Sequence, residues 1–62
     1  MKYFVLIKST GSKTEIKPNR IAEFFGLVRN VTGLDRAIAE AILNSGKPID
    51  HPEYRFTAKG RA

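Results

Sequence analysis

His51 is the only histidine in the chain, and histidine is the side chain best suited to proton transfer or metal binding near neutral pH. It lies between Asp50 and Pro52, and residues adjacent in sequence are poorly placed to act as a catalytic pair. One histidine without any cysteine does not supply a zinc ligand set. The Asp and Glu residues are scattered, and no pair has the context of an acid–base site. We therefore expect His51 to be a loop residue, and we expect neither a catalytic site nor a bound metal or cofactor.

Two short segments resemble a phosphate-binding loop. Such a loop needs Gly-x-x-x-x-Gly-Lys-Ser/Thr at the start of a helix, because the backbone amides there bind phosphate. In residues 10–14, Thr-Gly-Ser-Lys-Thr, Ser12 stands where the second glycine is needed and Ile7 where the first is. The Ser45-Gly46-Lys47 segment is followed by Pro48 and ends a helix. Both segments are predicted to be turns. Because 62 residues leave no room for a walled substrate pocket, we also expect no small-molecule substrate.

Length and charge indicate a single binding domain. The chain has 62 residues, enough for one domain (1–62), with 11 Lys and Arg against 6 Asp and Glu and a net charge of +5. This balance favours a polyanionic partner, either nucleic acid or an acidic patch on a protein. Simple solubility is the alternative, since small domains often carry such a charge. The absence of cysteine points to a reducing compartment, the cytoplasm, and we expect no membrane association.

Three strands are predicted. Residues 2–9 contain Tyr, Phe, Val, Leu and Ile in an unbroken block, which is typical of a strand. Residues 9–13 are predicted to form a turn, and residues 14–17 a short returning strand. Pro18 ends that strand because it lacks a backbone donor. After a loop at 49–52, Tyr54 and Phe56 alternate with Arg55 and Thr57, which is typical of a half-buried strand. The basic tail at 59–62 is expected to fray.

Two helices are predicted between these strands. Asn19 is the expected N-cap of the first, and Gly26 should interrupt or end it. Thr32 is the expected cap of the second helix, and Pro48 confirms its end. The expected apolar face of the first helix is Ile21, Phe24, Phe25 and Val28, and that of the second is Leu34, Ala37, Ile38, Ala41 and Ile42.

The predicted fold is α+β: a small antiparallel sheet, with the long first strand in the middle, and two helices packed on it. Because the first strand is apolar on both faces, covering one face would leave an apolar row rimmed by charge on the other. One helix on each face, or a dimer that covers the row, would also satisfy the pattern. The predicted partner-binding residues on the uncovered face are Lys2, Phe4, Leu6, Lys8 and Arg55.

A helix-turn-helix provides an alternative function. Ala22 and Gly26 have the spacing of the first helix and glycine turn of that motif, and residues 34–38 would start the recognition helix. The basic residues of the resulting winged-helix DNA-binding surface would be Arg36, Lys59 and Arg61. An ordinary helical hairpin on a sheet explains the same residues.

The aromatic residues allow a second nucleic-acid interpretation. Tyr3, Phe4, Tyr54 and Phe56 all fall on predicted strands, as stacking of single-stranded bases requires. Packing in the core explains them equally well.

The strand at residues 2–8, the helical pair at 19–44 and the closing strand at 53–59 form a compact basic strand–helix–helix–strand unit. In size, charge and order, this unit resembles the small phage-encoded regulators that bind a host's RNA polymerase. The similarity is one of overall make-up over most of the chain, so no binding residues carry over from it. It implies a non-enzymatic regulator in the cytoplasm of a bacterial host. Such a regulator binds RNA polymerase, and it inhibits initiation by disturbing the σ factor or suppresses termination.

Overall fold

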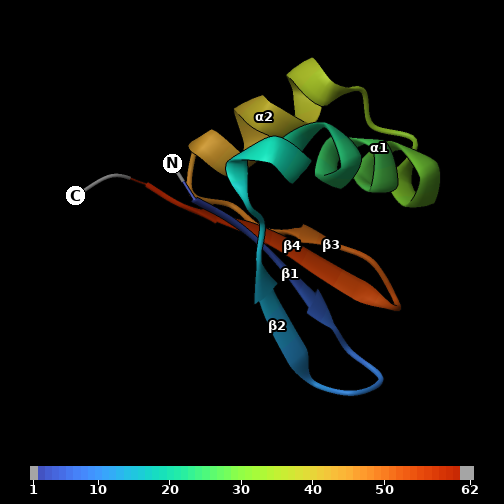
Figure 1. Cartoon of the computed structure of the whole chain (residues 1–62). Helices are drawn as coiled ribbons and strands as arrows, with labels where there is room; N and C mark the ends of the chain where they lie inside the picture. The colour runs from blue at the N-terminus through green and yellow to red at the C-terminus, as the bar shows by residue number, and fades with distance from the viewer. Residues whose placement is uncertain (1, 61–62) are drawn as a thin grey trace.

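The computed structural model describes residues 2–60 as one sheet with both helices on the same side of it (Figure 1). The elements are β1 (Lys2–Ile7), β2 (Ser12–Glu15), a 3-10 turn (Pro18–Arg20), α1 (Ile21–Thr32), α2 (Arg36–Asn44), β3 (Ile49–Asp50) and β4 (Tyr54–Lys59). The predicted α+β class with an antiparallel sheet is confirmed. Within the described range, neither helix has the length and apolar character needed to cross a membrane.

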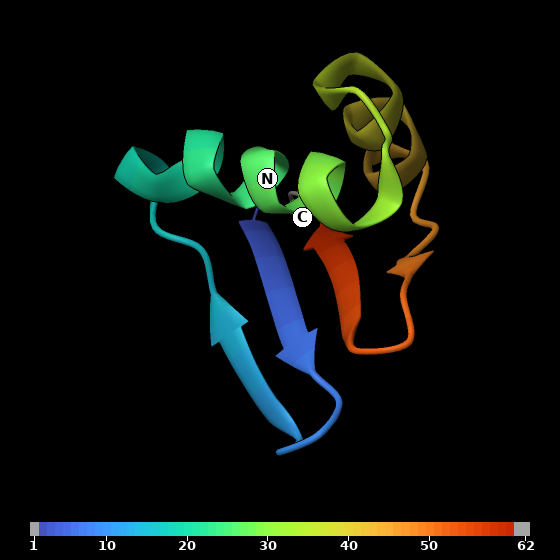
Figure 2. The same cartoon turned by 90° about the vertical axis from the view of Figure 1, so that its right-hand side faces the viewer.

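The sheet has the strand order β2-β1-β4-β3, so the long first strand is central, as predicted (Figure 2). It contains four strands where the sequence predicted three. The additional strand, β3, lies in the segment expected to be a loop and pairs Ile49 with Phe56 and Asp50 with Arg55. Ile49 is 5% exposed, and burying it against the core brings this short segment alongside β4.

The hairpin and the last strand differ from prediction by a few residues. β2 begins at Ser12, before the expected Thr14, because Gly11 adopts a φ of 75° and reverses the chain soon after β1. At the other end, Lys59 was expected to fray but forms the last residue of β4, directly opposite Lys2. Gly60 follows β4 without regular structure, and the last two residues of the expected tail, 61 and 62, lie outside the described residues.

The first helix, α1, continues through Gly26, where the sequence predicted a break. Its buried side chains are Phe24, Phe25 and Val28, three of the four on the predicted face. Burying three large apolar groups outweighs the cost of about 1 kcal/mol for a glycine inside a helix. The break comes at Gly33, which adopts a φ of 78° and donates its amide hydrogen to the carbonyl of Arg29 at 2.8 Å.

The two predicted N-caps are wrong. Asn19 lies in the 3-10 turn, and α1 begins at Ile21 with Arg20 in the N-cap position. Pro18 starts this turn early, because its fixed φ suits the first helical position. Thr32 is the last residue of α1, and its hydroxyl donates to the carbonyl of Val28 at 2.6 Å. It therefore bonds back into its own helix instead of capping the next one.

The second helix, α2, buries a different face from the predicted one. Ala39 and Leu43 are 0% and 1% exposed, whereas Ile38 is 50% exposed. Ala37 and Ala41, also on the predicted face, are exposed as well. Apolar residues occupy most positions of α2, so periodicity alone does not determine its orientation. Contacts with the sheet determine it instead.

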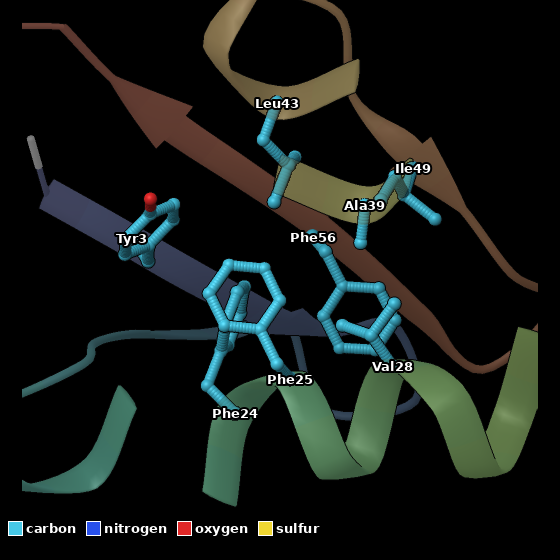
Figure 3. Close-up of a cluster of buried hydrophobic side chains, with 8 residues drawn as sticks. All are labelled: Tyr3, Phe24, Phe25, Val28, Ala39, Leu43, Ile49 and Phe56. Atoms are coloured by element: carbon cyan, nitrogen blue, oxygen red, sulfur yellow. The ribbon is translucent and has the colours of Figure 1, made fainter. Parts of the chain in front are cut away.

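The core lies between the helices and the sheet, with aromatic rings at its centre (Figure 3). Tyr3 of β1 lies 5.3 Å from Phe24 and 5.2 Å from Phe25, measured between ring centroids. Phe24 and Phe25 meet edge to face at 5.0 Å, an arrangement favoured by the ring quadrupoles. Among residues 2–60, the buried hydrophobic residues are Tyr3, Phe24, Phe25, Val28, Ala39, Leu43, Ile49 and Phe56.

Candidate binding surface

The strand register determines which side chains point away from the helices. Side chains alternate between faces along a strand, and directly opposed residues of paired strands share a face. Tyr3 is buried under the helices, so Phe4 and Leu6 point to the other face of β1. We call this second face the open face, because both helices lie on the opposite side of the sheet (Figure 1).

The open face combines an apolar centre with a charged border. By strand register it carries Lys2, Phe4, Leu6, Lys13, Glu15, Asp50, Arg55, Thr57 and Lys59, and Lys8 joins it through its ion pair with Asp50. Five of these side chains are basic and two are acidic, so the face is positively charged. Phe4 and Leu6 are half-buried, because neighbouring side chains on the same face of the sheet partly cover them.

Asp50 organises the charges at one side of the open face. Its carboxylate lies 2.7 Å from the Lys8 ammonium and 3.3 Å from Nε of Arg55. A second Arg55 nitrogen, Nη2, donates to the other carboxylate oxygen at 3.4 Å. Hydrogen bonding to Lys8, and then to Arg55, lowers the pKa of Asp50. Two of the five basic side chains are therefore already partly neutralised.

The remaining basic side chains are placed differently. The ammonium of Lys13 lies 5.0 Å from the centre of the Phe4 ring, within reach of a cation–π contact. Lys2 and Lys59 stand directly opposite each other on β1 and β4. Like charges directly opposite destabilise a sheet slightly, and no ion pair involves either lysine within residues 2–60. A bound anionic group would relieve this repulsion.

The structure brings together all five residues predicted for the open surface: Lys2, Phe4, Leu6, Lys8 and Arg55. The prediction left out five others that lie there: Lys13, Glu15, Asp50, Thr57 and Lys59, of which Lys59 was assigned only to the DNA-binding alternative. The alternation of side chains along a strand would have placed Lys13 and Glu15 on this face if the predicted strand had begun at Ser12 instead of Thr14. Asp50 could not be found in this way, because its segment was predicted to be a loop.

The residues predicted for DNA binding do not share a surface. The guanidinium of Arg36 lies in the helical layer, 5.0 Å from the Phe25 ring centre and 3.5 Å from the Glu40 carboxylate. Lys59 lies on the sheet, and Arg61 falls outside the described residues. The proposed glycine turn is also wrong, because Gly26 lies inside α1. The actual connection between the helices is residues 33–35.

The strand aromatics do not form a stacking platform. Tyr3 and Phe56 are buried among the core residues, and Tyr54 packs against the same cluster (Figure 3 labels the first two). Of the four aromatics considered, only Phe4 lies on the open face. The core interpretation is therefore correct for three of the four.

His51 has a structural role in a turn. Its Nδ1 accepts a hydrogen bond from the Glu53 amide at 3.0 Å, and its ring lies 5.7 Å from that of Tyr54. Across the part of the chain that the structure describes, no group of three or more His, Asp or Glu side chains could hold a metal ion.

No protein-family model, curated protein or solved structure matches the chain.

Proposed function

We propose that this chain is a non-enzymatic binding domain that docks a protein partner on the open face of its sheet. The observation that carries the proposal is the position of Phe4 and Leu6, apolar side chains at the centre of the sheet face opposite α1 and α2. Interfaces derive most of their binding energy from a few such central groups, while charged side chains at the rim affect the association rate. The open face has this arrangement.

A protein fits the open face better than single-stranded nucleic acid. Binding of single strands uses several exposed aromatic rings on which successive bases stack. The open face offers one ring, Phe4, and the Lys13 ammonium already lies over it. Leu6 beside it supplies apolar area without a stacking surface, which suits an apolar side chain of a protein.

Duplex DNA is the second candidate, and the short connection between α1 and α2 is the observation that favours it. Against it, Arg36 is the only basic side chain of α2, and it contacts Phe25 and Glu40 of its own chain. A recognition helix needs basic or amide side chains directed at the groove. α2 does not present such side chains to a groove.

The charges of the open face indicate the kind of protein. Lys2 and Lys59 form no ion pair within residues 2–60, so a complementary surface presents carboxylates beside an apolar contact. The resemblance to phage regulators makes bacterial RNA polymerase the first partner to test. The proposed role is inhibition of initiation, antitermination or both, in the cytoplasm of a bacterial host.

The test titrates variants against purified bacterial RNA polymerase and against duplex DNA, at low and moderate salt. Leu6→Ala should weaken polymerase binding by about tenfold or more, as expected for a central anchor. Lys59→Ala should weaken it only a few-fold, with a larger effect at low salt. Ile38→Ala is the matched control, because it also truncates an aliphatic side chain but in the helical layer. Circular dichroism must show that each variant is folded.

Tight binding to duplex DNA without polymerase would overturn this proposal, particularly if affinity falls with salt at a slope of about −0.9 per phosphate contact. Equal effects of Leu6→Ala and Ile38→Ala on polymerase binding would reject the open face as the docking surface. If nuclease treatment of a bacterial lysate abolished capture of the polymerase by this chain, the partner would be nucleic acid instead.

A further inference from the structure

The outer edge of β2 is a second surface with defined chemistry. β2 is the outermost strand of the sheet, and all four of its residues are exposed (Figure 2). Its hairpin projects away from the helices, so the helical layer does not cover this edge (Figure 1). The edge of an open strand can pair with another extended strand through its backbone.

The register identifies the backbone groups that this edge offers. In an antiparallel pair, residues alternate between bonding to the partner strand and facing away from it. The Ile16 amide donates to the Tyr3 carbonyl at 2.8 Å, so Ile16 faces β1, and Thr14 does so by alternation. Lys13 and Glu15 therefore direct their N–H and C=O groups outward, away from the sheet.

We propose that β2 pairs antiparallel with β2 of a second copy of this chain, with the twofold axis passing at Thr14. In this register Lys13 lies opposite Glu15 of the second copy, and Glu15 lies opposite its Lys13. Both residues have outward backbone groups, so each pair can exchange two hydrogen bonds. Both side chains point to the open face, which places two ion pairs across the junction.

Charge selects this register over its neighbours. Only shifts by two residues keep outward-facing groups opposite each other. One such shift places Lys13 opposite Lys13, and the other places Glu15 opposite Glu15, so both bring like charges together. With the twofold axis at Thr14, each Lys13 lies opposite a Glu15 of the other copy, so both contacts join opposite charges.

The ends of the strand also accommodate the second copy. In the proposed register, Ser12 of the second copy lies opposite Ile16. A shallow hollow at this end of β2 is lined by Thr14, Glu15, Ile16, Lys17 and Arg20 and leaves space for a small side chain. The two sheets then form one continuous sheet, and their open faces become contiguous.

The first experiment measures the molar mass by sedimentation equilibrium up to millimolar concentration. The mass should rise with concentration from 6.9 kDa towards twice that value. Lys13→Glu or Glu15→Lys alone should raise the dimer dissociation constant by about tenfold, because each makes both cross-edge pairs repulsive. The double variant Lys13→Glu/Glu15→Lys should restore dimerisation, and mixing the two single variants should give a heterodimer.

A proline substitution tests the backbone pairing separately. Lys13→Pro removes an amide that faces outward, so it should prevent dimerisation while leaving the monomer folded. Thr14→Pro is the matched control, because it removes an amide that faces β1 and should destabilise the fold itself. Ile38→Ser should leave the dimer intact, since Ile38 lies on α2.

A constant mass of 6.9 kDa at all concentrations would overturn this proposal. A dimer that survives Lys13→Pro, or is lost with Ile38→Ser, would place the interface elsewhere. A dimer that the double charge exchange does not restore would reject the register at Thr14. None of these outcomes bears on polymerase binding, which the variants of Leu6 test independently.

Discussion

Leu43 and Ile38 are aliphatic side chains of similar size on the same helix, α2, in opposite environments. Leu43 is 1% exposed within the core, whereas Ile38 is 50% exposed. We expect Leu43→Ala to lower the free energy of unfolding by about 2–5 kcal/mol, because the removed atoms leave a cavity. Ile38→Ala should change it by less than about 0.5 kcal/mol, since alanine's higher helix propensity offsets the small loss of contact.

The small size of the protein makes this difference easy to measure. A chain of 62 residues has a total stability of about 3–9 kcal/mol, at roughly 0.05–0.15 kcal/mol per residue. Leu43→Ala therefore removes a large part of it, and each kcal/mol lowers Tm by about 4–8 °C. Urea unfolding followed by far-ultraviolet circular dichroism measures the free energy, and thermal unfolding measures Tm.

Equal destabilisation by the two substitutions, or a larger effect at Ile38, would refute the orientation of α2. A larger effect at Ile38 would mean that α2 packs with the face that periodicity predicted. If Leu43→Ala is unfolded under all conditions, the milder Leu43→Met can be compared with Ile38→Met. Leu43→Met should lower the free energy of unfolding by up to about 1.5 kcal/mol, and this effect should still exceed that of Ile38→Met.

Two further predictions concern glycines and one ion-pair network. Gly26→Ala should raise the free energy of unfolding by about 0.5–1 kcal/mol, because Gly26 lies inside α1 and a Cβ there would meet open space. Gly33→Ala should lower the free energy of unfolding, because Gly33 has a φ of 78° that alanine rarely adopts. Urea denaturation of the two variants measures both changes. The pKa of Asp50 should rise on Lys8→Gln and also on Arg55→Gln, because each removes a hydrogen bond and a positive charge that lower it, as measured by NMR titration. Because the folded-state pKa is lowered, the network stabilises the fold above the ordinary carboxyl pKa, and this stabilisation should disappear as pH falls through the folded-state value. A pKa of Asp50 that neither substitution changes would contradict the network.

The sequence was sufficient for the elements whose residues form long, regular patterns. The apolar block of β1 predicted a central strand, and the i, i+3, i+4, i+7 pattern predicted the face of α1 that carries Phe24, Phe25 and Val28. It was also sufficient for the centre of the open face, because strand alternation alone places Phe4 and Leu6 together. These features depend on local periodicity, which a single sequence contains.

The rest depended on tertiary contacts that no local pattern contains. β3 has two residues, too few for any periodicity, and it pairs only because Ile49 is buried against β4. The orientation of α2 followed from packing of Leu43, since its helix is apolar on several sides. Asp50 joined the open face as a result of β3 pairing, so sequence reasoning missed it for the same reason.

The pairing of β1 with β4 also affects how the chain reaches its folded state. These two central strands are separated in sequence by residues 8–53, whereas the β1–β2 hairpin and the helix pair join near neighbours. Closing so long a loop carries an entropy cost that local contacts do not, and contacts between distant residues slow folding. The hairpin and the helix pair can form from local contacts, whereas the sheet centre, and with it the aromatic core around Phe56, requires the two ends of the chain to meet.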